Sequence, residues 1–189
     1  MLSLAGRRSI VSRARAAHTV AFFIVLAPAC SSTRATVLRS GAEPLIRSAV
    51  VCTRSVSPSG IKPYRSVQAL VDSLRPGQTG CLKPGLYRQN VVFRRGGSGD
   101  ARRITLSGAL GGRAVLLGTV EVVRGANFVT ISNLSLNGRV VPGIPSPQVN
   151  GNDVTLRNLD ITNEHTGICI VVGGAAGTFG TAWHTKIER

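Results

Sequence analysis

Acidic residues are scarce in this sequence of 189 residues, which holds 8 Asp and Glu against 23 Lys and Arg. Residues 1–50 contain seven Arg and one Glu, and residues 51–189 contain the remaining sixteen basic and seven acidic residues. A basic surface favours an acidic polymer as partner, such as a polyuronate, a teichoic-type glycan or a nucleic acid. A solvated basic surface without a partner accounts for the same excess of charge.

Features typical of nucleic-acid-binding chains are absent from this sequence. It contains no block of like charges, no basic helix pattern and no alternation of aromatic with basic residues. Nucleic acid is therefore not an expected partner, and an acidic polysaccharide or cell-wall glycan is the partner that the charge predicts.

Long hydrophobic runs are also absent. The longest candidate, "TVAFFIVLAPA" at Thr19–Ala29, is too short to span a bilayer. Four arginines between residues 7 and 15 precede this run, and Ala27-Pro28-Ala29 provides a small-x-small cleavage site at its end. Residues 1–29 are therefore predicted to be an export signal, which places the mature protein outside the cell or on its surface.

The export segment leaves two details open. "RRSIV" at Arg7–Val11 is similar to a twin-arginine motif, but arginine pairs also occur in ordinary signals. Cys30 directly follows the cleavage site, as a lipid-modified cysteine would, although Ala27 and Pro28 depart from the lipoprotein pattern. Lipidation of Cys30 is the only predicted contact with a membrane.

Cysteine is rare, with four residues in the chain: Cys30, Cys52, Cys81 and Cys169. No second Cys or His stands at ligand spacing, so no metal site is predicted. Export implies an oxidising compartment in which disulfides persist. Cys52 and Cys81 lie in strand-like segments on either side of one predicted helix, which makes them the best disulfide pair. The alternative is two free, buried thiols.

One helix is predicted after an irregular linker at residues 30–48. Four apolar residues recur at i, i+3, i+4 and i+7: Val67, Leu70, Val71 and Leu74. Ser66 can cap the start of this helix, and Pro76-Gly77 ends it. The following "GCLKPGLYRQNVVF" predicts two short strands around the Pro84-Gly85 turn.

A phrase then repeats along the chain. Val129–Asn133 and Val154–Asn158 share the pattern apolar-Thr-apolar-polar-Asn at a spacing of about 25 residues, and Ile104–Gly108 is a third copy at the same spacing. Thr185–Arg189 is a weaker fourth copy, displaced by a Gly-rich insertion. A fixed period in this range indicates a repeat architecture.

The repeats contain short strand patterns and no helical pattern, so they predict an all-β fold, a right-handed parallel β-helix with about 25 residues per coil. In the middle copy we expect strands near 128–132, 134–136 and 148–150. Equivalent residues should stack, so Val129 should lie between Ile104 and Val154, and Asn133 should join an amide ladder. The helix at Ser66–Leu74 should cap the N-terminal end.

The end of the sequence lies within the fourth copy. We therefore expect residues 49–189 to be an incomplete β-helix domain, the N-terminal fragment of a longer protein. The alternative is a short natural protein whose last coil is covered by a partner.

These residues resemble secreted bacterial right-handed parallel β-helix proteins of the pectate-lyase-like superfamily. Five segments carry the resemblance: Val56–Gly60, Tyr64–Arg88, Ile104–Gly108, Phe128–Gly138 and Asp153–Asn163. The family includes polysaccharide lyases, glycoside hydrolases, epimerases and proteins without assigned activity, so the resemblance implies a fold rather than a reaction. A lyase of this family would use Ca²⁺ held by carboxylates, with a basic residue as proton acceptor.

Few residues are candidates for such chemistry. Asp160 alternates with apolar neighbours and should point out of its coil, while Glu164 and His165 follow in the polar turn "NEHTG" and Arg157 precedes them. No Asp–Asp pair and no Asp–His dyad at the family's spacing is recognised, and a solvated outer face explains these residues equally well.

Trp183, followed by His184, is the candidate for stacking against a sugar, with ordinary packing as the alternative. The sequence thus predicts an exported protein that binds an acidic polysaccharide, with cleavage by the full-length protein as an open question. The alternative from another class is a non-catalytic structural or adhesion module of the cell surface.

Overall fold

The computed structural model describes residues 50–60, 63–138, 144–163, 168–175, 178–179 and 182–189. The predicted signal, the linker and Cys30 lie outside the described residues, as do Glu164 and His165.

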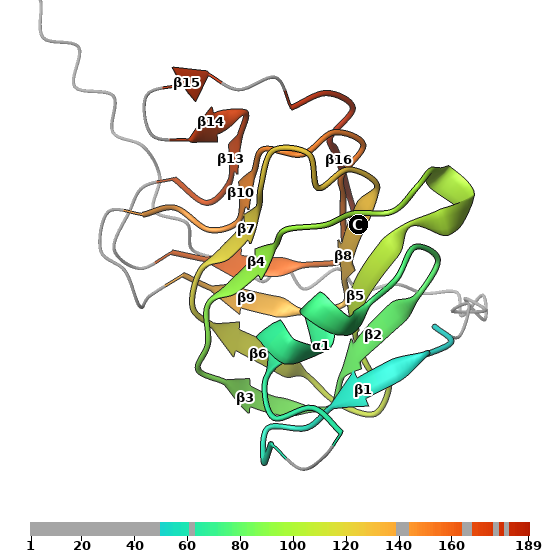
Figure 1. Ribbon diagram of the computed structural model, residues 1–189. Coiled ribbons are helices and arrows are strands. Elements are labelled where there is room, and N and C mark those ends of the chain that lie inside the picture. Colours follow the sequence, from blue (N-terminus) through green and yellow to red (C-terminus); the bar gives the residue numbers. More distant parts are fainter. Residues whose placement is uncertain (1–49, 61–62, 139–143, 164–167, 176–177, 180–181) are drawn as a thin grey trace, which may run out of the picture.

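Three parallel sheets run side by side along the molecule (Figure 1). The largest sheet, called sheet A, consists of β1 (Arg54–Val56), β2 (Thr79–Leu82), β5 (Ile104–Gly108), β8 (Val129–Ser132), β11 (Thr155–Arg157) and β16 (Lys186–Glu188). Sheet B consists of β3 (Gly85–Tyr87), β6 (Ala114–Leu117), β9 (Ser135–Asn137) and β12 (Asp160–Thr162). Sheet C consists of β4 (Val91–Phe93), β7 (Val120–Val122), β10 (Gln148–Val149) and β13 (Val171–Val172).

Each coil of the chain gives one strand to each sheet, so the described residues form a parallel β-helix of about four turns. This confirms the predicted fold class. The first coil comprises β2, β3 and β4, where the sequence predicts only two strands. These strands are only three or four residues long, and the turn after Tyr87 separates β3 from β4. A short helix, η1 (Asp100–Arg102), and the antiparallel pair β14 (Gly174–Ala175) and β15 (Thr178–Phe179) lie between coils.

The predicted period holds in sheet A. Ile104 pairs with Val129, and Leu156 pairs with Ile131, each 25 residues apart. The fourth copy is also confirmed, because Ile187 on β16 pairs with Leu156 at a spacing of 31 residues. The extra residues belong to the insertion that contains β14 and β15. In sheet B the spacing changes from coil to coil, because the loops between sheets differ in length.

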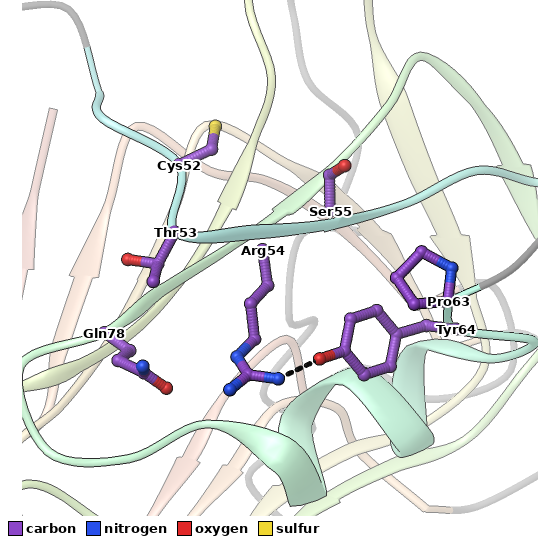
Figure 2. Close-up of a pocket in the computed structure, with 7 residues that line it drawn as sticks. All are labelled: Cys52, Thr53, Arg54, Ser55, Pro63, Tyr64 and Gln78. Atoms are coloured by element: carbon purple, nitrogen blue, oxygen red, sulfur yellow. Dashed lines mark hydrogen bonds between the residues drawn. The ribbon is translucent and has the colours of Figure 1, made fainter.

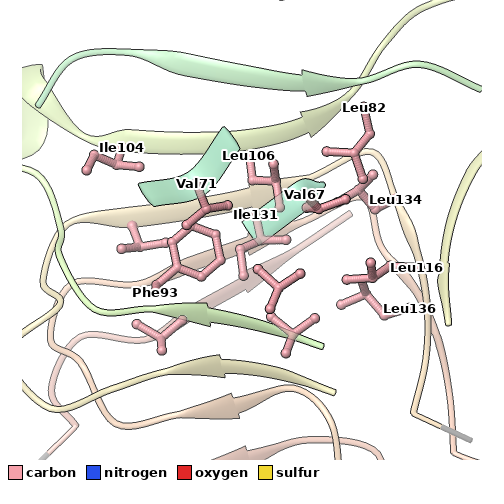
Figure 3. Close-up of a cluster of buried hydrophobic side chains, with 14 of the residues drawn as sticks. Val67, Val71, Leu82, Phe93, Ile104, Leu106, Leu116, Ile131, Leu134 and Leu136 are labelled. Atoms are coloured by element: carbon pink, nitrogen blue, oxygen red, sulfur yellow. The ribbon is translucent and has the colours of Figure 1, made fainter. Parts of the chain in front are cut away.

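Aliphatic side chains fill the interior of the coils (Figure 3). Leu106, Ile131 and Leu156 form one column from sheet A and are at most 1% exposed, and Leu116 and Leu136 form another from sheet B. Burying each such side chain contributes about 1.5–3 kcal/mol, so the stack is the main source of stability.

Helix α1 (Val67–Ser73) covers the N-terminal end of the stack, as predicted (Figure 1). The Ser66 hydroxyl accepts a hydrogen bond from the Ala69 amide at 3.0 Å and caps the helix. Leu70 is fully buried, and a Cβ added at Gly80 of β2 would lie 3.1 Å from its side chain. A glycine at this position therefore lets the helix approach the first coil closely.

The same helix also covers the open edge of sheet C. The Gln68 side chain accepts a hydrogen bond from the Val92 amide at 2.8 Å and donates one to the Val92 carbonyl at 3.0 Å. The side-chain amide thus replaces a neighbouring strand for β4, whose edge groups would otherwise be unpaired.

The turn after sheet A carries the predicted amide ladder. Asn158 Nδ2 donates to Asn133 Oδ1 at 2.7 Å, and Asn133 Nδ2 donates to Ser107 Oγ at 3.1 Å. One coil below Asn133 stands Gly108, where a Cβ would lie 2.1 Å from the Asn133 carbonyl oxygen. The close approach of the two coils explains why the repeat has glycine there.

A disulfide joins Cys52 to Cys81, which confirms the predicted pair, and no described cysteine is free. It fixes the segment before β1 to β2 in the first coil. Within the described residues, no helix has the length and apolar character needed to cross a bilayer.

Candidate functional site

The structure assigns Asp160 and Arg157 to separate ion pairs. Asp160, on β12, pairs with Arg113, whose Nε also donates to the Ser135 hydroxyl. Arg157, on β11, donates from Nε to Glu188 at 3.0 Å. Each pair joins one coil to another on the outer surface. The two residues predicted from the sequence are therefore not brought together by a contact, and their partners Glu164 and His165 lie outside the described residues.

A calcium site requires several oxygen ligands around one cation. The described residues contain no group of three Asp, Glu, His or Cys side chains that could hold a metal ion. Asp160 faces a guanidinium group, and Asp153 faces an imidazole. These side chains do not fit the Ca²⁺ site that the family resemblance implies, so we derive no step through Ca²⁺.

A different group of residues gathers where each coil enters sheet A. We call it the turn edge. It consists of two neighbouring columns of stacked residues, Arg102, Asn127, Asn152 and Trp183 in one and Arg103, Phe128, Asp153 and His184 in the other. Successive coils are about 4.8 Å apart, so the edge extends for about 14 Å along the stack.

Three residues of the turn edge share an unusual backbone conformation. Phe128, Asp153 and His184 have φ values of 54°, 55° and 56°. This left-handed region is disfavoured for residues other than glycine, and especially for a bulky side chain such as Phe128. The same turn conformation therefore recurs in three successive coils. Because the backbone repeats, these three residues stack in one column.

Asp153 and His184 form a polar pair at the C-terminal end of the edge. His184 Nδ1 lies 3.0 Å from Asp153 Oδ1, and the His184 side chain is 73% exposed. When the imidazole is neutral, donation from Nδ1–H to the carboxylate leaves Nε2 as a hydrogen-bond acceptor toward solvent. The carboxylate thus orients a ring nitrogen that a ligand can reach.

Trp183 lies beside this pair, in the neighbouring column. Its backbone amide donates to Asn152 Oδ1 at 3.1 Å, and its carbonyl accepts from the Asp153 amide at 2.8 Å. Asn127 Oδ1 accepts from the Asn152 amide at 2.9 Å in the same way one coil below. These bonds hold the Trp183 backbone in place, while the residue remains 60% exposed and available for stacking.

Arg103 fixes the lower part of the edge. Its guanidinium donates to Asp100 Oδ1 at 2.7 Å and to Thr130 Oγ1 at 2.9 Å, and it also bonds the Asp153 carbonyl. Its side chain is only 20% exposed. Arg103 therefore ties three coils together, and the neighbouring Arg102, which is exposed, is the basic residue of this edge best placed to meet an anion.

Trp183 is a candidate from the sequence, whereas the Asp153–His184 pair emerges only from the structure. The repeat itself contains the information that could have identified this pair. When the fourth copy is aligned with Thr185 on Val154, His184 falls on Asp153. The insertion increases their separation to 31 residues, which hides the pair from a search at a fixed spacing.

With an oriented imidazole, an exposed indole and an exposed guanidinium in adjacent columns, the turn edge can form hydrogen bonds, apolar stacking contacts and ion pairs with one extended ligand. Comparisons with protein-family models, with curated proteins and with solved structures find no match to this chain.

Proposed function

We propose that this protein is an exported β-helix protein that binds an acidic polysaccharide along the turn edge. The observation that carries the proposal is the position of exposed Trp183 and His184 in the two columns that contain Arg102 and Arg103. A sugar ring has apolar faces that pack on an indole, and a uronate carboxylate pairs with a guanidinium. The excess of charge in residues 51–189, with sixteen Lys and Arg against seven Asp and Glu, favours such a polymer.

Binding to polygalacturonate and alginate, measured by calorimetry with neutral dextran as the comparison, tests this proposal. We expect both acidic polymers to bind, dextran not to bind, and affinity to fall as salt rises, because the attraction between exposed charges is screened. Equal binding of dextran, or no binding of either acidic polymer, would contradict the proposal.

Trp183→Ala tests the position of the site. We expect affinity for polygalacturonate to fall about tenfold, equivalent to about 1.4 kcal/mol of lost stacking, with the fold unchanged because the side chain is exposed. Leu110→Ala is the matched control, since Leu110 is also an exposed apolar residue, at 68%, outside the turn edge. If both variants bind as the wild type does, the ligand binds elsewhere.

A second function is favoured by the ion pairs of Asp160 and Arg157. Both residues join coils through partners of opposite charge, as supports of the scaffold would. This arrangement favours a non-catalytic structural or adhesion module of the cell surface. Incubation with polygalacturonate and alginate, with and without Ca²⁺, tests the non-catalytic character of such a module, because a lyase would produce unsaturated uronate absorbance and a structural module would not.

A further inference from the structure

A second polar site lies at the N-terminal end of the stack, between β1 and the segment that leads into α1. It is an open pocket of about 510 Å³, a volume within the usual range for sites that bind small molecules. Figure 2 shows Arg54 at its centre, with Tyr64 on one side and Gln78 with Thr53 on the other. We call it the end pocket.

The register of sheet A explains why Arg54 faces this pocket. Arg54 pairs with Gly80, so the two residues face the same side of sheet A. A Cβ at Gly80 would point at Leu70 and Leu74, and the Arg54 side chain likewise extends toward α1 (Figure 2). Its guanidinium donates to the Tyr64 hydroxyl. The guanidinium carbon is 5.9 Å from the Tyr64 ring centroid, and Figure 2 shows it approaching the hydroxyl rather than the face of the ring.

Arg54 is a partly buried cation without a carboxylate partner among the described residues. The residues that line the pocket include no Asp or Glu. A guanidinium carries five N–H donors, and one of them is used by Tyr64. A partly buried charge is costly unless it is paired, so the vacant donors favour an anion.

Other groups in the pocket can also donate. Gln78 Oε1 accepts from the Arg75 amide at 2.9 Å, which orients the Gln78 side chain and leaves its Nε2 without a partner among the described residues. Thr53 Oγ1 accepts from the Thr79 amide at 3.2 Å, so its own proton is available. Hydrogen bonding to Ser73 and to Arg54 lowers the pKa of Tyr64, as expected in a pocket that favours negative charge.

We propose that the end pocket binds a small organic carboxylate of about monosaccharide size, with the carboxylate on the Arg54 guanidinium and Gln78 donating to the ligand. Arg54 forms paired hydrogen bonds with a planar carboxylate. No residue that lines the pocket belongs to the turn edge, although Gln78 follows Gly77, which lies against Arg102 of that edge. The ligand of the pocket does not depend on the function proposed for the turn edge.

Tyr64 provides a direct readout for this site. The chain has two tyrosines, and burial raises the pKa of the other, Tyr87, to about 12. Ultraviolet absorbance of tyrosinate below that pH therefore reports on Tyr64. A bound carboxylate draws the guanidinium away from the Tyr64 oxygen and adds a negative charge, so we expect it to raise the pKa of Tyr64.

The experiment compares D-glucuronate with D-glucose, two sugars that differ in the carboxylate. We expect glucuronate to shift the Tyr64 titration to higher pH with saturation, and glucose and sodium chloride of the same ionic strength to leave it unchanged. No shift with glucuronate, or an equal shift with glucose or chloride, would overturn the proposal.

Two variants locate the effect. Arg54→Gln should raise the pKa of Tyr64 without ligand and abolish the response to glucuronate, and Gln78→Ala should weaken the response at least threefold while keeping Arg54. If Arg54→Gln does not fold, the wild-type titration and the Gln78→Ala variant still test whether glucuronate binds in the end pocket. Trp183→Ala should respond as the wild type does, so failure of the turn edge to bind polysaccharide leaves this test intact. Loss of the response in Trp183→Ala would assign it to the turn edge and overturn the end pocket.

Discussion

At the scale of single residues, the turn after sheet A depends on asparagine. Asn133 and Asn158 have φ values of 55° and 46°, a region that asparagine tolerates better than most residues. The same side chains form the ladder between coils, with Asn158 Nδ2 on Asn133 Oδ1. Asparagine thus serves both the backbone conformation and the contact, and the repeat keeps it for two physical reasons.

Substitution of Asn133 can separate these two contributions. Asn133→Gly removes the ladder but suits the left-handed backbone, and we expect it to lower the free energy of unfolding by about 1 kcal/mol. Asn133→Ala loses the ladder and adds backbone strain, so we expect a loss of about 2 kcal/mol. Urea denaturation followed by circular dichroism measures both. If Ala is tolerated as well as Gly, the positive φ of Asn133 is not a constraint on stability.

At the scale of elements, α1 closes the end of the β-helix in two ways. Its apolar face, with Val67, Leu70 and Val71, packs on the first coil. Its Gln68 side chain forms the two hydrogen bonds that a further strand would give to Val92. Apolar packing covers the interior of the coil, and the amide covers the edge of β4, so one short helix protects both the core and the sheet edge.

Substitution of Gln68 tests the second of these roles. Gln68→Ala leaves both Val92 groups without a partner, and we expect the free energy of unfolding to fall by about 1–3 kcal/mol. Faster hydrogen exchange at the Val92 amide would identify the lost bond.

Gln68→Glu is the matched variant. An ionised carboxylate repels the Val92 carbonyl oxygen and lies near Asp72, whereas a protonated one offers one donor and one acceptor, as the amide does. We therefore expect Gln68→Glu to gain stability relative to Gln68→Ala as pH falls through the pKa of the carboxyl group. An unchanged difference between the two variants would show that Gln68 does not cover the edge.

At the scale of the whole molecule, the disulfide joins the start of the described chain to the stack. Cys52 and Cys81 are 29 residues apart, and the loop between them contains β1 and α1. The bond therefore restricts the unfolded chain over the part that caps the β-helix. It also holds β1, and with it Arg54 of the end pocket, against the first coil.

Replacement of both cysteines, Cys52→Ser with Cys81→Ser, measures this contribution. Loop closure of this length is worth about 3.5 kcal/mol, and we expect the free energy of unfolding to fall by about that amount. Non-reducing peptide mapping of the wild type should recover the linked peptides. A loss below about 1 kcal/mol would show that the segment before β1 adds little to the stability of the stack.

Much of the scaffold follows from the sequence alone. Alternating Val, Thr and Ile residues that return after 25 positions define the strands of sheet A, because equivalent positions must stack when a coil closes. The spacing of Val67, Leu70 and Val71 defines the capping helix, and the cysteines on either side of it define the disulfide. These features depend on local pattern, which a sequence states directly.

The two sites depend on tertiary structure. His184 meets Asp153 only because an insertion of unequal length still returns the chain to the same edge, and Arg54 meets Tyr64 only because β1 and α1 enclose the end of the stack. These contacts depend on the lengths of the loops between strands and on the packing at the end of the stack. A periodic sequence pattern encodes neither. The sequence by itself therefore determined how this protein is built, and the tertiary structure decided which of its polar side chains lie together.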